Sequence, residues 1–154
     1  MNDAACKACV GSWPRPDHFI ADCGVTRAYL HDDQFFPGWT VLVLNRHAVE
    51  LFHLSRDERS GLIEEVSAVA AVLAKEWRAV KINYELLGNQ LPHIHWHLIP
   101  RLPQDPAPLE PVWRMTHEPI QLTPDALDAT IERLRNVWLT PMNQRDTTRK
   151  FSSP

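Results

Sequence analysis

Three histidines occupy alternate positions in one short stretch of this chain. His93, His95 and His97 lie within the segment PHIHWHLIP at 92–100, with apolar residues between them. Successive side chains of a β-strand point to opposite faces, so a strand would place the three imidazoles on one face and the apolar residues on the other. A helix would scatter both sets. The alternation therefore predicts a strand that carries a shared histidine site.

Imidazole suits several kinds of chemistry. The neutral ring is a nitrogen nucleophile towards phosphorus, and the protonated ring donates a hydrogen bond to a phosphate oxygen or a leaving oxygen. Its unperturbed pKa of about 6.5 lets both forms exist near neutral pH. Three imidazoles on one face can also hold a metal ion. The triplet alone leaves three interpretations open: catalysis, metal binding, or a polar strand face without a function.

The cysteines form a second constellation. The chain has Cys6, Cys9 and Cys23, an odd number that argues against a closed disulfide framework. The spacing of Cys6 and Cys9 fits two ligands of a tetrahedral zinc site. The alternatives are a redox pair, which the absence of a thioredoxin-like βαβ pattern disfavours, or two free thiols. We expect Cys23 to be buried as a small apolar residue.

The composition excludes several classes of protein. The 154 residues suit one domain, and 44% apolar with 23% charged residues is typical of a soluble globular protein. The net charge of -3 comes without a basic stripe, so we expect no nucleic-acid partner. No run approaches the ~18 apolar residues of a membrane span, and the N-terminus lacks signal-peptide features. We expect a cytoplasmic protein without a membrane partner.

The apolar pattern divides the chain into strands and helices. Residues 19–25 and 26–30 are predicted to form two short strands or one interrupted strand, and further strands are predicted at 40–44, 81–87 and 93–100. The last two are antiparallel because their connection is short. Ser55 and Glu58 form a capping box before the clearest helix. That helix has an apolar stripe at helical spacing, formed by Leu62, Val66, Val69, Leu73 and Trp77.

A second amphipathic helix is predicted from Thr123, with Pro124 at its first position. Residues 1–18 are expected to be irregular, and residues 143–154 to form a disordered polar tail beyond a single domain at 1–142. The predicted fold class is α+β: an antiparallel sheet with one long helix packed on it and a C-terminal helix. The four histidines that stand singly are interpreted as surface or structural: His18, His31, His53 and His117.

The segment around the triplet resembles the signature of the histidine triad (HIT) family, in which three histidines alternate with apolar residues. Here the signature reads HIHWHLI at 93–99 and is followed by Pro100 and Arg101. The segments 37–43, 45–55 and 81–89 resemble the family's upstream turn and strand, the approach to its helix, and its phosphate-side strand and loop. The similarity runs from about Ala28 to Arg101 and is closest to bacterial members that resemble diadenosine polyphosphate hydrolases.

The resemblance implies roles for individual residues. His95 would attack the α-phosphorus of a nucleotide and form a covalent nucleotidyl-histidine, and His97 would hydrogen-bond the phosphate or the leaving oxygen. Asn83, Gly88 and Asn89 would contact the phosphates. Many members have Gly-Gln where this chain has Gly88-Asn89. The side chain of Asn89 is one methylene shorter than that of glutamine, so its amide reaches less far. The alternative interpretation of Asn89 is a plain turn residue. The family needs no metal for this chemistry.

The resemblance also implies a metal site and an oligomer. Some members pair a Cys-x-x-Cys motif with two histidines, which here would make Cys6, Cys9, His47 and His93 the ligands of a structural zinc ion. A homodimer is expected.

The implied activity is a nucleotide hydrolase or transferase acting at the α-phosphate of a dinucleoside polyphosphate or a nucleoside phosphoramidate. The alternatives are a nucleotidylyltransferase with a phosphate or sugar-phosphate acceptor, and a non-enzymatic nucleotide-binding protein.

Overall fold

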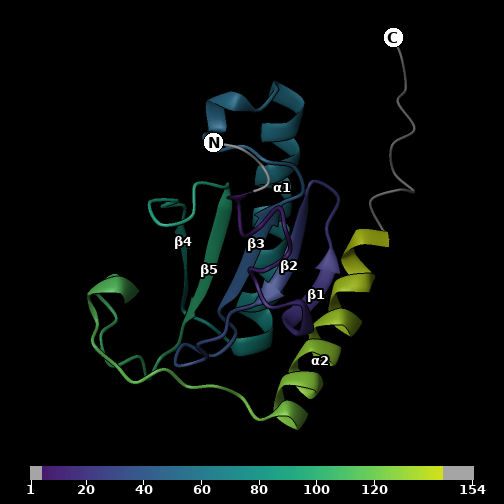
Figure 1. The fold of residues 1–154 in the computed structure, drawn as a ribbon. Helices are drawn as coiled ribbons and strands as arrows, with labels where there is room; N and C mark the ends of the chain where they lie inside the picture. Colours follow the sequence, from purple (N-terminus) through teal and green to yellow (C-terminus); the bar gives the residue numbers. More distant parts are fainter. Residues whose placement is uncertain (1–4, 144–154) are drawn as a thin grey trace.

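Five antiparallel strands form the sheet of this protein, and the computed structural model describes residues 5–143. The strands are β1 (Phe19–Asp22), β2 (Thr26–Leu30), β3 (Thr40–Leu44), β4 (Lys81–Glu85) and β5 (His95–Arg101). Their order in the sheet is β1-β2-β3-β5-β4, so the histidine strand lies between β3 and the edge strand β4. Figure 1 shows β5 beside β3. Apart from Asn143, the predicted tail at 143–154 lies outside the described residues.

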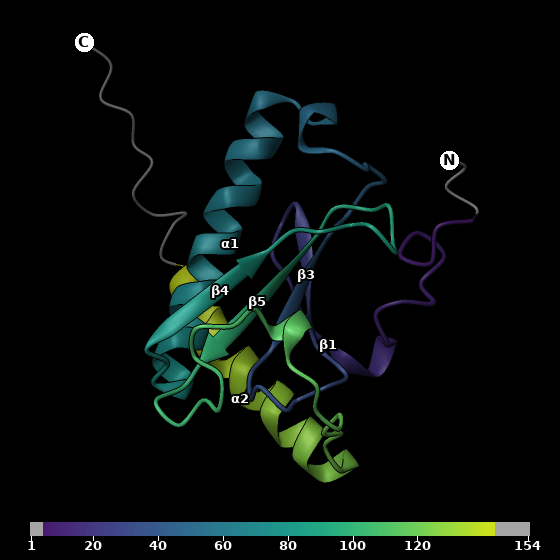
Figure 2. The same ribbon diagram turned by 90° about the vertical axis from the view of Figure 1, so that its left-hand side faces the viewer.

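Two helices cover one face of the sheet. They are α1 (Arg56–Trp77) and α2 (Pro124–Asn143), and α2 packs on β1 while α1 packs on β5 and β4. Figure 2 shows both helices on the same side of the strands. The predicted α+β fold is thereby confirmed. Within residues 5–143 no helix is long and apolar enough to cross a membrane.

Helix α1 begins where the capping box predicts. The Ser55 side chain accepts a hydrogen bond from the Glu58 backbone, and the Glu58 carboxylate accepts one from the Ser55 backbone N–H. Both bonds satisfy N–H groups that a helix start leaves unpaired. The predicted stripe faces the sheet, where it joins the main core of the protein with Leu62, Val66, Val69, Ala70 and Leu73 buried.

The turn before β3 requires a glycine. Gly38 has a φ of +86°, a backbone conformation that L side chains rarely adopt. A Cβ at this position would lie 2.6 Å from Cδ2 of Trp77, so the turn also packs closely on the end of α1. The Gly38 N–H donates to Oε1 of Gln34, at 2.9 Å. This turn fixes the start of β3 and the position of Trp39, which follows it.

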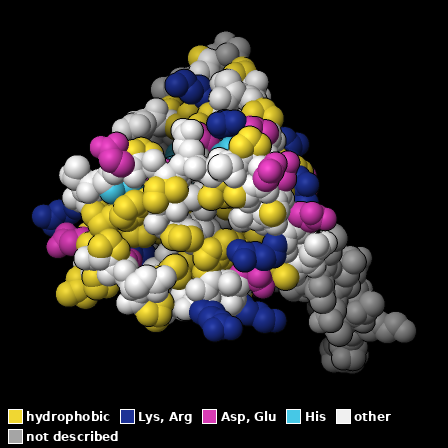
Figure 3. Space-filling view, turned by 90° about the horizontal axis from the view of Figure 1, so that it is seen from below, with side chains coloured by type: hydrophobic (Ala, Val, Ile, Leu, Met, Phe, Trp, Pro, Cys, Tyr) yellow, Lys and Arg dark blue, Asp and Glu magenta, His cyan; other side chains and the backbone are white. Residues whose placement is uncertain are grey.

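The connection between β5 and α2 is long and rich in proline. It contains one short 3-10 helix, Val112–Arg114, and it passes along the lower side of Figure 1. Figure 3 views the molecule from that side and shows hydrophobic side chains gathered on the surface there. Three large hydrophobic residues of this connection are exposed: Leu109, Trp113 and Ile120.

Candidate active site and metal-ligand cluster

The histidine triplet lies on the sheet face opposite the helices. His95 and His97 pair with Val43 and Val41 of β3, so both side chains point to the same face. Ile94 and Leu98 point the other way and are part of the main core. The segregation predicted from the period of two is therefore confirmed. β5 begins at His95 rather than at the predicted position 93, because the backbone before Ile94 bends out of the ladder.

A cavity of about 460 Å³ opens over this face. His95 and His97 line it, together with Gly88 and Asn89 of the loop before β5. The structure thus brings together four of the residues predicted from the sequence. Seven further residues complete the lining: Lys7, Trp13, His31, Leu87, Gln90, Leu91 and Trp113.

His95 is held in one tautomer. Its Nδ1 lies 2.6 Å from the carbonyl oxygen of His93, which can only accept, so Nδ1 carries the proton and donates. The lone pair of the neutral ring is then on Nε2. Burial lowers the pKa of His95 below its ordinary value, and the hydrogen bond to His93 opposes that shift. Trp13 packs edge-on against the ring, at 4.9 Å between centroids. His95 therefore has the arrangement of a nitrogen nucleophile.

His97 is held in the opposite tautomer. The indole Nε1–H of Trp39 donates to its Nδ1 at 3.1 Å, and an indole N–H can only donate. The neutral ring therefore carries its proton on Nε2, where it can donate to an anion. Burial lowers the pKa of His97 to about 3, with smaller contributions from His95 and His31. At neutral pH His97 is an uncharged hydrogen-bond donor.

Asn83 and Arg101 contact each other from the neighbouring strands β4 and β5. Asn83 does not line the cavity, and its Oδ1 accepts a 2.6 Å hydrogen bond from Nη1 of Arg101. The buried guanidinium also pairs with Asp105 and donates to the carbonyls of Ala107 and Glu110. The amide oxygen of Asn83 thus helps to hold an arginine that anchors the proline-rich connection, and the phosphate contact expected of Asn83 stays a prediction.

The predicted metal ligands converge at the other end of the triplet. Cys6 and Cys9 place their sulfur atoms 3.4 and 3.6 Å from Nδ1 of His93, and Cys9 Sγ lies 3.4 Å from Nδ1 of His47. All four donor atoms lie within 4.8 Å of one another. Nε2 of His93 donates to the Leu44 carbonyl at 2.8 Å, so Nδ1 keeps its lone pair towards the sulfur atoms.

These distances suit a tetrahedral metal ion. Zn–S bonds of about 2.3 Å and Zn–N bonds of about 2.0 Å imply S···N separations of about 3.5 Å at tetrahedral angles. The three measured separations fall at that value. Two thiolates and two neutral imidazoles are a common donor set for structural zinc. Cys23 lies elsewhere, buried in the main core as expected.

Trp13, Trp39 and His31 are among the residues around His95 and His97 that the sequence did not predict. Trp13 and Trp39 come from irregular segments, and nothing in their spacing points to the triplet. His31, interpreted as a surface or structural residue, lines the cavity and stacks on Trp39 with 4.0 Å between ring centroids. Burial lowers the pKa of His31. An aromatic residue beside a turn gives no local signal of what it contacts, because these contacts depend on how distant segments meet.

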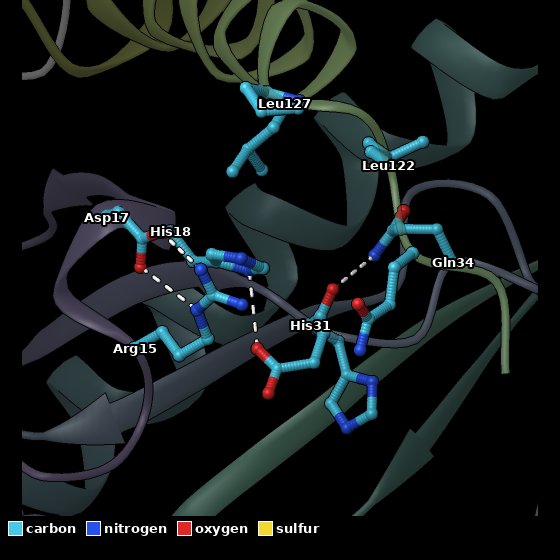
Figure 4. Close-up of a pocket in the computed structure, with 10 residues that line it drawn as sticks. Arg15, Asp17, His18, His31, Gln34, Leu122 and Leu127 are labelled. Carbon is cyan, nitrogen blue, oxygen red and sulfur yellow. Dashed lines mark hydrogen bonds and ion pairs between the residues drawn. The ribbon is translucent and has the colours of Figure 1, made fainter.

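A smaller hollow of about 110 Å³ shares His31 with the active-site cavity. Arg15 and Asp17 lie on one side of it and Gln34 on the other (Figure 4). These polar groups are already paired: Arg15 with Asp17, His18 with the Leu30 carbonyl, and Gln34 with the carbonyls of His31 and Trp39. We therefore assign the larger cavity over the histidines as the candidate active site.

Comparison with known proteins agrees with this geometry. Residues 14–104, more than half of the chain, match the HIT domain family. The chain therefore belongs to the histidine triad family, as the resemblance of the triplet predicted. A comparison with curated protein sequences finds no match.

Solved structures from bacteria are similar along most of this chain. A histidine triad protein from Sinorhizobium meliloti is 30% identical with a TM-score of 0.71, covering 77% of this chain and 87% of its own. One from Bradyrhizobium japonicum is 29% identical with a TM-score of 0.70 and the same coverage. A histidine triad protein from Marinobacter aquaeolei is 26% identical with a TM-score of 0.73, covering 80% of this chain and 89% of its own. A diadenosine triphosphate hydrolase from Plasmodium falciparum, 10% identical with a TM-score of 0.61, shares the fold and covers 82% of this chain and 80% of its own.

Proposed function

We propose that this protein is a nucleotide hydrolase or transferase that acts at the α-phosphate of a nucleoside 5′-phosphate compound. The observation that carries the proposal is the pair of fixed tautomers in one cavity. His95 directs an Nε2 lone pair outward, and His97 offers an Nε2–H beside it. A nucleophile and a neighbouring anion donor are the two groups that displacement at phosphorus needs.

The reaction proceeds in two displacements. Nε2 of His95 bonds to the α-phosphorus while the bond from phosphorus to the leaving group breaks, which gives a nucleotidyl-histidine. Nε2–H of His97 donates to the phosphate or the leaving oxygen as negative charge develops there. The loop at Gly88 and Asn89 contacts the phosphates. Water, or another acceptor, then attacks phosphorus, and the P–N bond returns its electron pair to His95.

A turnover screen tests this activity. Wild type and His95→Ala are compared on diadenosine triphosphate, diadenosine tetraphosphate and adenosine phosphoramidate, with and without inorganic phosphate as acceptor. We expect wild type to release AMP and the variant to release none. Turnover only with phosphate present would identify a nucleotidylyltransferase. Nucleotide binding without any turnover would contradict the enzymatic proposal and favour a binding protein.

We also propose that Cys6, Cys9, His47 and His93 hold a structural zinc ion. The ion would tie the N-terminal segment to the start of β5, because His93 comes two residues before His95. Metal analysis of the purified protein should find about one zinc per chain. The Cys6→Ser variant should lose the metal and unfold at a lower temperature, whereas Cys23→Ser should keep the metal. Native protein without metal and with unchanged stability would contradict this assignment.

We further propose a cytoplasmic homodimer. β4 is an edge strand, and its outer side has no partner strand within residues 5–143. A second copy that pairs there across a two-fold axis would extend the sheet and cover this edge. Sedimentation should give the mass of two chains, and a monomer at micromolar concentration would contradict the proposal.

A further inference from the structure

The active-site cavity contains one residue with a fixed charge. Of the eleven residues that line it, three are histidines, and Lys7 is the only lysine, arginine, aspartate or glutamate. Burial favours the neutral form of His31 and of His97. A nucleotide is an anion, so the charge of Lys7 is the main fixed electrostatic feature of the lining.

The cysteine loop holds the backbone of Lys7 in place. Lys7 lies between Cys6 and Cys9, whose sulfur atoms face His93 and His47. Its carbonyl oxygen accepts hydrogen bonds from the backbone N–H groups of Ser12 and Trp13, at 2.9 and 3.2 Å. Among residues 5–143, none of the ion pairs involves Lys7. A hydrogen-bonded loop thus carries an ammonium group that lines the cavity and forms no ion pair among the described residues.

Building on the proposed function, we propose that Lys7 binds the anionic leaving group of the substrate, so that the site selects nucleotides with a polyphosphate leaving group over those with an amine. When Nε2 of His95 bonds to the α-phosphorus, the P–O bond to the rest of the chain breaks and its electron pair stays on a phosphate oxygen. The ammonium group balances this charge through charge-assisted hydrogen bonds. An amine leaving group carries no such charge, so Lys7 has less to stabilise.

The hydrogen bond from Trp39 to His97 favours the same substrate class. A departing amine must take up a proton, which an imidazolium would supply, whereas a departing phosphate chain leaves as an anion. The Trp39 N–H occupies Nδ1 of His97, so a second N–H on that ring would point at another donor. His97 therefore acts as a neutral donor that stabilises an oxyanion rather than as an acid.

Two substitutions in the full-length protein test the role of Lys7. Lys7→Gln removes the charge and Lys7→Arg retains it, while Lys75→Gln removes an equal charge from the exposed surface of α1, on the opposite side of the sheet. Calorimetry measures binding of AMP and ATP to each protein. We expect wild type to prefer ATP, Lys7→Gln to reduce the ratio of ATP to AMP affinity about tenfold, and the other two variants to keep it. An unchanged ratio in Lys7→Gln would overturn the proposal.

Kinetics separates this inference from the proposed function. For wild type we expect a higher kcat/KM on diadenosine tetraphosphate than on adenosine phosphoramidate, and Lys7→Gln should reduce that ratio about tenfold. If turnover depends on His95 but the ratio is the same in Lys7→Gln, Lys7 has no role and the activity stands. If no compound turns over while Lys7→Gln still loses its preference for ATP, the proposed activity fails and the role of Lys7 in binding stands.

Discussion

Replacing Trp39 by Phe tests how the site controls the protonation of His97. Trp39 is almost fully buried, and its ring stacks on His31 while its N–H donates to Nδ1 of His97. Phe keeps an aromatic ring at this position but removes the donor. Nδ1 of His97 then becomes a buried acceptor without its partner, and it is open to a proton.

The size of the effect follows from the lost hydrogen bond. Leaving a buried acceptor unsatisfied costs about 1–3 kcal/mol, so the free energy of unfolding should fall by about 2 kcal/mol. The bond is made only to neutral His97, so it lowers the pKa of that ring. At about 1.4 kcal/mol per pKa unit, a loss of about 2 kcal/mol should raise the pKa of His97 by about 1.5 units. The shift is upward because, in wild type, a proton on Nδ1 of His97 would face the N–H of Trp39, and in Trp39→Phe that N–H is gone.

Nuclear magnetic resonance of the histidine rings reports the tautomer and the pKa of His97, and a urea titration measures the free energy of unfolding. In wild type at pH 7 we expect the proton on Nε2 of His97 and on Nδ1 of His95. Trp113→Phe is the matched control, because this indole also packs against His97, at 5.2 Å, but its N–H bonds to Glu85. A wild-type His97 with its proton on Nδ1, or an equal pKa of His97 in Trp39→Phe and wild type, would show that Trp39 does not control the protonation of His97.

Three other perturbations have expected outcomes. Arg101→Met leaves a buried carboxylate without its partner and should lower the free energy of unfolding by about 3–5 kcal/mol in urea titrations; a loss under 1 kcal/mol would show that the ion pair does not anchor the connection. His97 has a pKa of about 3 when folded and about 6.5 when unfolded, so the unfolded chain binds the extra proton and stability falls as pH drops below about 6.5. His97→Gln should reduce that slope by about 1.4 kcal/mol per pH unit, and an unchanged slope would contradict the shift. In Gly38→Ala the new Cβ meets the Trp77 ring, so the free energy of unfolding should fall by about 2 kcal/mol. The fall should be smaller in Gly11→Ala, because a Cβ there would meet nothing within 4 Å. Equal losses in the two variants would contradict the close packing at Gly38.

Much of the fold follows from local patterns in the sequence. The period of two in β5 and the capping box before α1 are properties of adjacent residues, and the structure has both. The alternation also predicts that His95 and His97 share one face, because side-chain direction in a strand is fixed by position alone. The predicted start of α2 after Thr123 is also confirmed, because a cap residue followed by proline is a local signal.

The rest of the site depends on contacts between distant segments. Trp39 is 58 residues from His97 in the sequence. Its N–H reaches Nδ1 of His97 because the turn at Gly38 places the indole there, and no sequence spacing predicts this contact. The partner of Asn83 is likewise set by the register of β4 against β5, which brings Arg101 close to its amide. The phosphate contact implied for Asn83 by the family resemblance stays a prediction, whereas the contact between Asn83 and Arg101 could not be predicted because it depends on strand register.

Trapping the covalent intermediate identifies the nucleophile of this protein. Wild type is mixed with diadenosine tetraphosphate, quenched in base within milliseconds, and digested for mass spectrometry. We expect the peptide from 82 to 101 to gain one AMP group and fragmentation to place that group on His95. Release of AMP without any labelled histidine, or a label on His93 or His97 instead, would exclude His95 as the nucleophile.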